Sequence, residues 1–414
     1  MSKTNSEPEM AAPSGENPPP VASAPAKGER FRTGEVLTLS AAHFTHDLYP
    51  SFIGPFLPLI IQKHGLTLAA AGFIATVIRW PGIAMPFLGY LADRWDARPF
   101  VIWGPTVSAL CLSSLGWAPN YLVLIVLLLV AGFASSAFHP ASSAMVTYAS
   151  GGRWGRATSF YMTGGELART AGPPFAVAVV SLFSFEGAWV AAAPAILVSL
   201  FAYGQLGGRS TRVLTRPAPA GLGKAIRASK RPLLLLIGVV TFRSLVISSF
   251  QIFYVTYLTG LGEALWIAGL ALAVYEAGGV VGAILGGPVS DRFGRRSVMA
   301  VSQVLSGPIL FAALLWSTQP IGLVALFIGG LLTISAGPVQ LALAQELLPG
   351  NRSLASGIMM FLSFEGTVIS SLAIGFLADL TGLGGALGWS ILASMLSVPF
   401  TLLLPETRAH STGH

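Results

Sequence analysis

The sequences GYLADRWDAR at residues 89–98 and GPVSDRFGRR at residues 287–296 decide the fold. In each, an aspartate follows the glycine by four positions and an arginine comes next, and the two copies begin 198 residues apart. Arginine after an apolar segment is expected on the cytosolic side of any membrane protein, but the repeated spacing from glycine to aspartate exceeds that expectation. The repetition therefore indicates a tandem duplication.

A second pair of acidic residues supports the duplication. Glu166 lies 73 positions after Asp93, and Glu365 lies 74 positions after Asp291. Two features that keep their register to within one residue point to two related halves. Transporters of this design place their substrate near the middle of the membrane, between the halves.

The composition is that of a membrane protein. Of the 414 residues, 53% are hydrophobic and only 10% are charged, and the mean hydropathy is +0.70, whereas a soluble domain carries about 25% charged residues. The 47 glycines and 28 prolines suit transmembrane helices, which tolerate both. The single cysteine, Cys111, excludes an intrachain disulfide framework and a cysteine-based metal cluster.

Apolar stretches long enough to cross a bilayer, about 20 residues each, recur from residue 36 to residue 404. They predict an all-α membrane protein with twelve transmembrane helices in two pseudo-symmetric six-helix bundles. The predicted domains are a disordered cytosolic tail at 1–34, bundles at 35–206 and 233–404, a basic cytosolic linker at 207–232 and a cytosolic tail at 405–414. The twelve predicted spans are 36–61, 68–91, 99–118, 121–146, 157–183, 187–206, 233–258, 265–289, 298–317, 321–346, 354–378 and 384–404.

The distribution of basic residues predicts the orientation. With both termini inside, 20 of the 24 lysines and arginines are cytosolic, three lie within spans, and Lys63 alone is outside. We therefore expect a multi-pass protein of the bacterial inner membrane with cytosolic termini. The linker at 207–232 has seven basic residues and no acidic one, which favours contact with anionic lipid headgroups. A nucleic-acid-binding arm is a weaker alternative, because no aromatic residues interleave with the charges.

The two repeated loops resemble the signature of the Major Facilitator Superfamily, Gly-x-x-x-Asp-Arg-x-Gly-Arg-[Arg/Lys]. The second copy matches fully, whereas the first has Asp96 and Ala97 where glycine and arginine are usual. Physically, the glycine permits close helix approach and the aspartate can pair with nearby arginines, so that a polar latch on the cytosolic side breaks when the halves rock apart. The predicted latch residues are Gly89, Asp93, Arg94, Gly287, Asp291, Arg292 and Arg296.

Other strings resemble the fosmidomycin-resistance branch of efflux transporters. They are HFTHDL at 43–48, FHP at 138–140, Arg79, and Arg243 followed by serine. The resemblance implies the twelve-helix fold and proton-driven export.

The fifth predicted span also resembles the antiporter motif of drug exporters. It carries the pairs Gly164-Gly165 and Gly172-Pro173. It departs from the motif at Glu166 and Arg169, where uncharged residues are usual.

Charged residues within spans cost at least about 2.5–3.5 kcal/mol each, and are functional candidates by default. His43 and Asp47 are four residues apart and His46 is close by, so the three can share a helix face. A histidine beside a carboxylate can exchange protons at physiological pH. The predicted proton-coupling residues are Asp47, His43, His46, Glu365 and Glu166.

Two other interpretations of this histidine cluster remain open. The first is a polar packing cluster between the first and fourth spans, with His139 as partner. The second is a metal site made by His43, His46, Asp47 and His139, which are suitable ligand types. We expect no metal and no cofactor.

Arg79 and Arg243 have no acidic residue within one turn of their own helices. Because arginine keeps its charge, each needs a carboxylate from another helix or an anionic ligand. Two guanidinium groups from opposite halves would suit a phosphonate, phosphate or carboxylate. The predicted substrate-binding residues are Arg79, Arg243, His139, Glu276, Arg169, Tyr254 and Gln340.

For several of these residues a structural role is the alternative. Glu166 and Arg169, three residues apart, can instead form an ion pair that holds the first half together. Glu276 and Glu365 have no evident same-helix partner, and burial favours their protonated forms. Tyr254 and Gln340 are neutral residues that can simply pack helices.

These observations predict a proton-coupled secondary transporter that works by alternating access. It would export small anionic or amphipathic compounds, such as phosphonate-type drugs, through the lipid bilayer, and act as a monomer without nucleic acid. One alternative is a proton-coupled importer of an organic anion, and another is a non-transporting membrane receptor. No Walker-type sequence or catalytic triad is present, which argues against ATP-driven transport and against an enzyme.

Overall fold

The computed structural model describes residues 30–84, 96, 98–207, 227, 230–348 and 352–406, apart from the side chains of residues 154, 352–354, 356, 357 and 360. The predicted latch residues Gly89, Asp93 and Arg94 lie outside the described residues. So do most of both predicted tails and of the linker at 207–232.

The first half of the described chain is helical throughout its predicted spans. Pro50 divides the first span, because proline has no N–H to donate to the carbonyl group four residues earlier. The helices are α1 (Thr33–Leu48), η1 (Pro50–Phe52), α2 (Ile53–His64), α3 (Leu68–Val77), η2 (Trp80–Ala84), α5 (Arg98–Ser113), η3 (Ser114–Trp117), α6 (Tyr121–Ala149), α7 (Trp154–Phe183), η4 (Glu186–Ala192) and α8 (Ala193–Leu206).

The second half repeats this arrangement with longer uninterrupted helices. Gly382, with a φ of 73°, breaks the longest one between the predicted spans 354–378 and 384–404. That left-handed backbone suits glycine, which lacks a Cβ atom. The helices are α10 (Lys230–Gly260), α11 (Leu265–Phe293), α12 (Arg295–Leu315), α13 (Pro320–Leu347), α14 (Arg352–Ser394) and α15 (Ser397–Leu402).

The chain is an all-α membrane protein, and each of the twelve predicted spans coincides with helix in the described residues. Eight helical stretches of the described chain are long and apolar enough to cross a membrane, and one of them, Phe361–Leu402, covers most of the last two predicted spans. The predicted spans 36–61, 68–91 and 157–183 are not among the eight. The first is divided at Pro50, the second is described only as far as Ala84, and the third carries charged residues.

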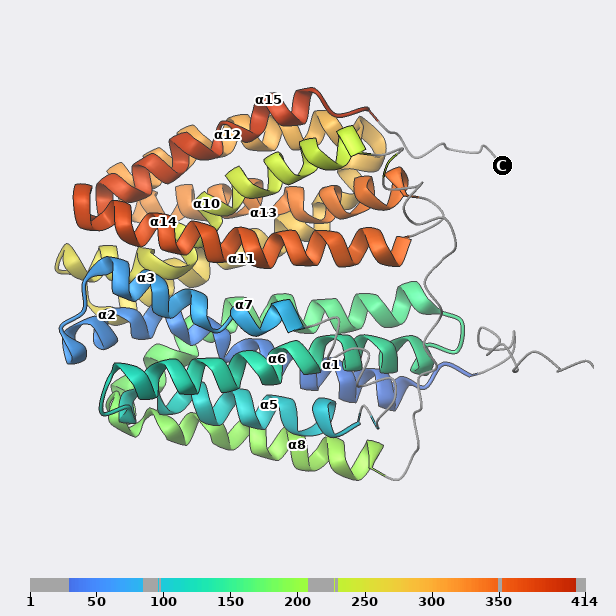
Figure 1. Ribbon diagram of the computed structural model, residues 1–414, viewed down its shortest axis with the longest axis horizontal. Helices are drawn as coiled ribbons and strands as arrows, with labels where there is room; N and C mark the ends of the chain where they lie inside the picture. Colours follow the sequence, from blue (N-terminus) through green and yellow to red (C-terminus); the bar gives the residue numbers. More distant parts are fainter. Residues whose placement is uncertain are drawn as a thin grey trace, which may run out of the picture.

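Figure 1 shows the two halves side by side, the first from blue to green and the second from yellow to red, with their helices nearly parallel to the long axis. We call the end of the molecule where α8 stops at Leu206 and α10 starts at Lys230 the linker end. We call the opposite end, where α2 stops at His64, the far end.

Small residues let helices approach closely within the second half. Gly278, Gly282 and Gly286 are spaced by four residues along α11 and face α13. A Cβ atom at Gly282 would collide with the carbonyl oxygen of Leu331. Without such space the two backbones could not pack at this distance, which is the usual role of small residues between membrane helices.

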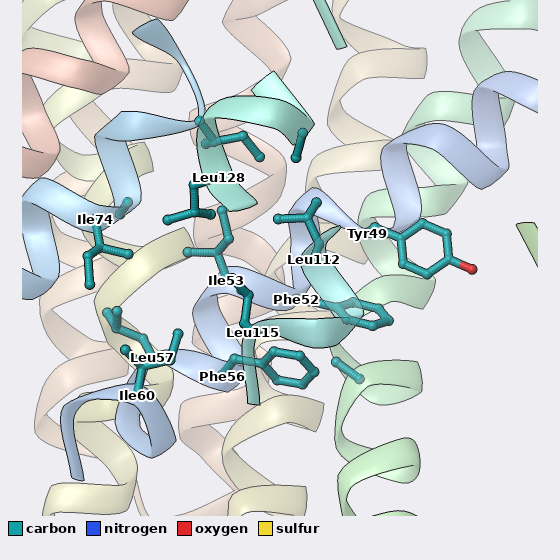
Figure 2. Close-up of a cluster of buried hydrophobic side chains, with 14 of the residues drawn as sticks. Tyr49, Phe52, Ile53, Phe56, Leu57, Ile60, Ile74, Leu112, Leu115 and Leu128 are labelled. Carbon is teal, nitrogen blue, oxygen red and sulfur yellow. The ribbon is translucent and has the colours of Figure 1, made fainter. Parts of the chain in front are cut away.

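The largest buried apolar cluster joins the two halves toward the far end. It contains Phe52, Phe56 and Ile60 from the first half together with Phe253 and Ile374 from the second. Figure 2 shows its aromatic and aliphatic side chains around α2, with Tyr49, Phe52 and Phe56 in a row. This cluster is therefore a core that both halves share.

Toward the linker end, the described residues form separate cores for the two halves. One cluster includes Leu39, Val101 and Met145 of the first half. Another includes Val239 and Leu343 of the second half. The buried apolar packing is thus continuous across the halves at the far end and divided between them at the linker end.

Candidate functional site

The predicted histidine cluster is built around His43 in α1. Its Nδ1 lies 2.8 Å from the carbonyl oxygen of Tyr161 in α7, and its ring stacks on the Tyr161 ring at 4.0 Å between centroids. The Tyr161 hydroxyl is 2.6 Å from the Ser142 hydroxyl in α6. Because a carbonyl oxygen only accepts hydrogen bonds, Nδ1 of His43 carries a hydrogen.

Asp47, one turn further along α1, lies between two histidines. Its Oδ2 is 3.3 Å from Nε2 of His43, and its Oδ1 is 3.7 Å from Nε2 of His139 in α6. Since Nδ1 of His43 already holds a hydrogen, a neutral ring would direct a lone pair from Nε2 at the carboxylate. The contact is favourable only with a further proton, either on His43 or on Asp47.

Gly165 in α7 makes room for this pair. A Cβ atom there would lie 2.6 Å from Cε1 and 3.0 Å from Nε2 of His43, and 3.1 Å from Oδ2 of Asp47. A neighbouring glycine, Gly164, packs in the same way against the backbone of α1, where a Cβ atom would lie 2.6 Å from the carbonyl oxygen of Ser40. The two glycines therefore let α7 close directly over the histidine–carboxylate pair.

His46 belongs to the same cluster but does not contact the carboxylate in any recorded bond. It is completely buried, its Nδ1 lies 3.5 Å from the Ser108 hydroxyl, and its Nε2 has no hydrogen-bond partner among the described residues. Its ring stacks on Phe138 at 4.3 Å and meets His139 edge-on at 5.2 Å. It supports the position of His139 by packing.

His43, Asp47 and His139 are also the described residues that could hold a metal ion. One ligand atom from each lies within 4.8 Å of the others, and imidazole with carboxylate suits divalent transition metals. The hydrogen bond from Nδ1 of His43 to a carbonyl group is the outer contact that metal-binding histidines usually make. Three of the four predicted metal ligands therefore lie together, His46 is not among them, and the metal alternative stays a prediction.

A second set of charges lies between α7 and the neighbouring helices. Glu166 and Arg169 form an ion pair one turn apart on α7, with side chains 27% and 40% exposed. Arg169 also interacts electrostatically with Asp47 and with Glu276 of the second half. Glu276 is buried and accepts a 2.9 Å hydrogen bond from Gln251 of α10. These charges connect the histidine cluster to the second half.

Arg79 follows α3 and faces the second half. Its guanidinium carbon lies 5.4 Å from the centre of the Phe364 ring in α14, and its charge interacts with those of Asp47 and Arg169. No carboxylate forms a salt bridge with it in the described part of the chain. Glu365, next to Phe364, is partly buried and has no recorded ion pair among the described residues.

Arg243 is buried in the second half and is held by α13. Its Nε donates to the carbonyl oxygen of Thr333 at 2.9 Å, and its Nη1 donates to Oε1 of Gln340. Within the described ranges it has no carboxylate partner. Tyr254, another predicted contact residue, is fully buried and stacks on Phe250 at 5.1 Å between centroids.

The second predicted latch makes its bonds within its own half. Asp291 pairs with Arg295 at 2.6 Å, and Arg295 reaches Glu346 of α13 at 3.0 Å. Arg296 lies 3.7 Å from Glu406, and the Arg292 guanidinium carbon lies 5.4 Å from the Phe293 ring centre.

The close approach predicted for Gly287 is not made to any of the described residues. A Cβ atom there would meet none of them within 4 Å, whereas one at the preceding Gly286 would collide with the carbonyl oxygen of Ser335. The close approach therefore falls one residue earlier than the repeated loop suggests.

Several residues of the site were not predicted from the sequence. Tyr161 acts through its backbone carbonyl group, which has no side-chain signal. Phe364 acts across helices whose neighbours a single sequence does not reveal. The pairing of Arg295 did have a signal in the sequence. Arg295 follows Asp291 by four positions, which places the two on one helix face, and Glu346 is an acidic residue near the end of α13.

Comparison with known proteins identifies relatives along nearly the whole chain. The profile described as the Major Facilitator Superfamily matches residues 39–272 and 244–413. The fosmidomycin resistance protein of Escherichia coli is 28% identical over 411 residues, covering 95% of this chain and 98% of that protein. The probable sulfoacetate transporter SauU of Cupriavidus necator is 25% identical over 400 residues, covering 86% and 92%.

Solved structures share the fold. A bacterial homologue of the human lysosomal transporter Spinster, in an inward-facing conformation, superposes with a TM-score of 0.73 at 16% identity, covering 91% of this chain and 96% of that one. The nucleoside transporter NupG gives a TM-score of 0.72 at 15% identity, covering 89% and 98%.

Proposed function

Because this chain belongs to the Major Facilitator Superfamily, and is therefore a multi-pass membrane transporter and not an enzyme, we propose that it is a proton-coupled antiporter. In this proposal it exports small anionic or amphipathic compounds by alternating access. The fosmidomycin resistance protein, similar over 95% of this chain, supports export of phosphonate-type compounds. The proton supplies the driving force as it returns inward.

The observation that carries the proposal is the contact between His43 and Asp47. The carbonyl group of Tyr161 fixes the hydrogen on Nδ1 of His43, so the 3.3 Å contact between Nε2 and Oδ2 needs one added proton. With that proton the pair holds no unfavourable lone-pair contact, and without it the two groups repel. A site whose local geometry depends on one proton is suited to link protonation with rearrangement of α1 and α7.

The charges next to this pair provide the link to substrate. Arg79 and Arg169 interact electrostatically with Asp47, so a proton on the pair changes the field at both guanidinium groups. An anionic substrate would bind these arginines better with the carboxylate neutral. By this interaction proton and anion favour each other's binding, which suits the importer described below. Export requires instead that the proton and the substrate occupy the site in turn, so that arrival of the proton releases the substrate. His139 and Glu276 lie at the edges of the same group of charges.

Further carriers and contacts complete the proposal. Glu365 and Glu166 are proposed as further proton carriers, Glu166 from within its ion pair with Arg169. Arg243 has no recorded carboxylate partner in the described residues and is held by neutral groups. It is proposed to contribute positive charge from the second half, with Gln340 and Tyr254 supporting it.

The orientation follows from the basic residues. We infer that the linker end faces the cytosol of a bacterium, that both termini are cytosolic, and that the linker lies against anionic lipid. The protein acts as a monomer, since each six-helix half finds its partner within one chain.

Import of an organic anion is the second candidate. The probable sulfoacetate transporter, 25% identical over 400 residues, supports an organic anion as the substrate, because sulfoacetate is a small dianion that two guanidinium groups would bind well. The same residues would serve, with proton and anion moving inward together.

Proteoliposomes loaded with a pH-sensitive dye test the proposal. An imposed proton gradient should drive fosmidomycin flux, opposite in direction to the protons, and Asp47→Asn should abolish uphill transport while leaving downhill exchange. Retention of full gradient-driven transport by Asp47→Asn would show that this carboxylate does not couple protons. Parallel assays with sulfoacetate, in which protons and anion move in the same direction, distinguish the importer from the exporter.

A further inference from the structure

Asp379 of α14 binds the start of α3, in the other half of the chain, at the far end. Its Oδ1 accepts a hydrogen bond from the backbone N–H of Leu68 at 2.8 Å, and its Oδ2 accepts one from Ala69 at 2.9 Å. The two partners are separated by more than 300 residues of sequence. We propose that Asp379 is a gate residue, a clamp between the halves that holds the far end closed and must release for the far end to open.

The clamp uses groups that every helix leaves free. The first N–H groups of a helix have no partner within it, and the helix dipole favours a negative charge beside them. In α3 these groups are satisfied in order: Leu68 and Ala69 by Asp379, and Ala70 by the Thr67 hydroxyl at 3.1 Å. Removing Asp379 would leave two N–H groups for water to satisfy.

The backbones of the same two helices touch directly below the clamp. A Cβ atom at Gly72 of α3 would lie 2.6 Å from the carbonyl oxygen of Ser371 and 3.1 Å from Cα of Gly375. One at Gly375 would lie 2.6 Å from the carbonyl oxygen of Leu68. Ser371, Gly375 and Asp379 are spaced by four residues, so one face of α14 makes the whole joint.

This joint lies where the halves share their core. The buried cluster that includes Phe253 and Ile374 of the second half with Ile60 and Ile74 of the first is continuous there. The clusters toward the linker end are separate for the two halves. The clamp therefore secures the only end at which, within the described residues, one apolar core spans both halves.

The inference rests on the proposed alternating-access function, because a gate matters only if the far end opens. Opening separates α3 from α14, and it exchanges both bonds of Asp379 for bonds to water. Asp379 thus adds to the stability of the far-end-closed state and not to that of the open state, which is what a gate residue requires.

A labelling experiment on purified protein in lipid nanodiscs tests the clamp without substrate or protons. Ser371, whose side chain is fully buried in the joint, is replaced by cysteine in a Cys111→Ser background, and the rate of reaction with a polar maleimide is measured. Asp379→Asn and Asp379→Ala should each speed labelling about fivefold. Glu186→Gln is the matched control, since this far-end carboxylate bonds Lys63 within its own half, and it should leave the rate unchanged.

Two results would overturn the clamp. One is a labelling rate in Asp379→Asn equal to that of the parent, because this nearly isosteric change removes the charge and one acceptor without altering packing. The other is an equal acceleration by Glu186→Gln, which would show a general charge effect. The proposed function is refuted by a different result, full proton-driven flux in Asp47→Asn. Failure of the clamp and failure of the proposed function are therefore distinguishable.

Discussion

Replacement of Gly165 by alanine should damage the proton site while leaving the rest of α7 intact. The added Cβ would lie 2.6 Å from Cε1 of His43 and 3.1 Å from Oδ2 of Asp47, whereas carbon atoms in contact prefer about 3.5–4.0 Å. The His43 ring must therefore move by about 1 Å, away from either Asp47 or the Tyr161 carbonyl group. Overpacking of this kind costs about 1–3 kcal/mol, or about a 5- to 150-fold fall in the ratio of folded to unfolded protein.

The assay pairs thermal unfolding in detergent with proton-driven flux in proteoliposomes. Gly165→Ala should lower both the melting temperature and the rate of proton-driven flux. Gly155→Ala, on the same helix and with none of the described residues within 4 Å of the new atom, should leave flux unchanged and stability equal or slightly higher, since alanine favours helix. Gly165→Ala should lower the stability of a His43→Ala protein much less than it lowers the stability of the parent, because the ring that obstructs the new Cβ atom is gone.

Two results would refute the reasoning. If Gly165→Ala keeps the parent's stability and coupling, the glycine does not make room for the pair. If the destabilisation is the same with and without the His43 ring, the strain arises against another neighbour.

Three further predictions concern other parts of the molecule. Arg79→Gln should weaken binding of anionic ligands at least about tenfold, measured by tryptophan fluorescence, with little change for cationic ligands; equal losses would contradict the anion role. Gly282→Ala should destabilise the protein by about 1–3 kcal/mol, whereas Gly287→Ala should be tolerated, and similar melting temperatures for the two would contradict the packing of α11 on α13. A hydrogen bond from Arg98 holds the pKa of Asp96 below its usual range. The interaction between Arg98 and Asp96 adds at most about 1 kcal/mol to the free energy of unfolding, because the pair is so exposed. This stabilisation should be present at neutral pH and lost as the pH falls below about 4. The difference in melting temperature between parent and Asp96→Asn should shrink in acid, and a difference independent of pH would contradict the assignment.

Hydropathy predicted the helical membrane fold and the positions of most spans. The span predicted at 265–289 corresponds to Leu265–Phe293, and the one at 121–146 to Tyr121–Ala149. Long apolar helices dictate these positions, because the backbone must satisfy its own hydrogen bonds in lipid. The break in the first span was missed, since average hydropathy over a window does not register the missing N–H of Pro50.

The candidate site was predictable only along single helices. The four-residue spacing of His43 and Asp47 indicated their contact, and the three-residue spacing of Glu166 and Arg169 indicated their ion pair. Contacts between helices depend on which faces meet, and one sequence does not specify that.

The residues that were not predicted show why contacts between helices cannot be inferred from one sequence. Tyr161 contributes a carbonyl group, which every residue has, and Asp379 resembles any acidic residue just past an apolar span. Arg243 was predicted to contribute charge to a ligand site, but the hydrogen bonds that it donates to Thr333 and Gln340 of α13 could not be inferred without the packing of the second half.

The shared core at the far end has a consequence for how inhibitors reach this protein. Opening that end would bring buried side chains such as Phe253 and Ile374 into contact with water, at about 25 cal/mol per Å² of apolar surface. In the orientation proposed above the linker end faces the cytosol, and a compound arriving from that side meets the conformation described here. A compound arriving from the other side binds only after the far end opens, so its apparent affinity falls by the population of the open form. The proposal therefore predicts two dissociation constants for the same molecule, one for each face of the membrane, with lower inhibitory doses for compounds that enter the cell.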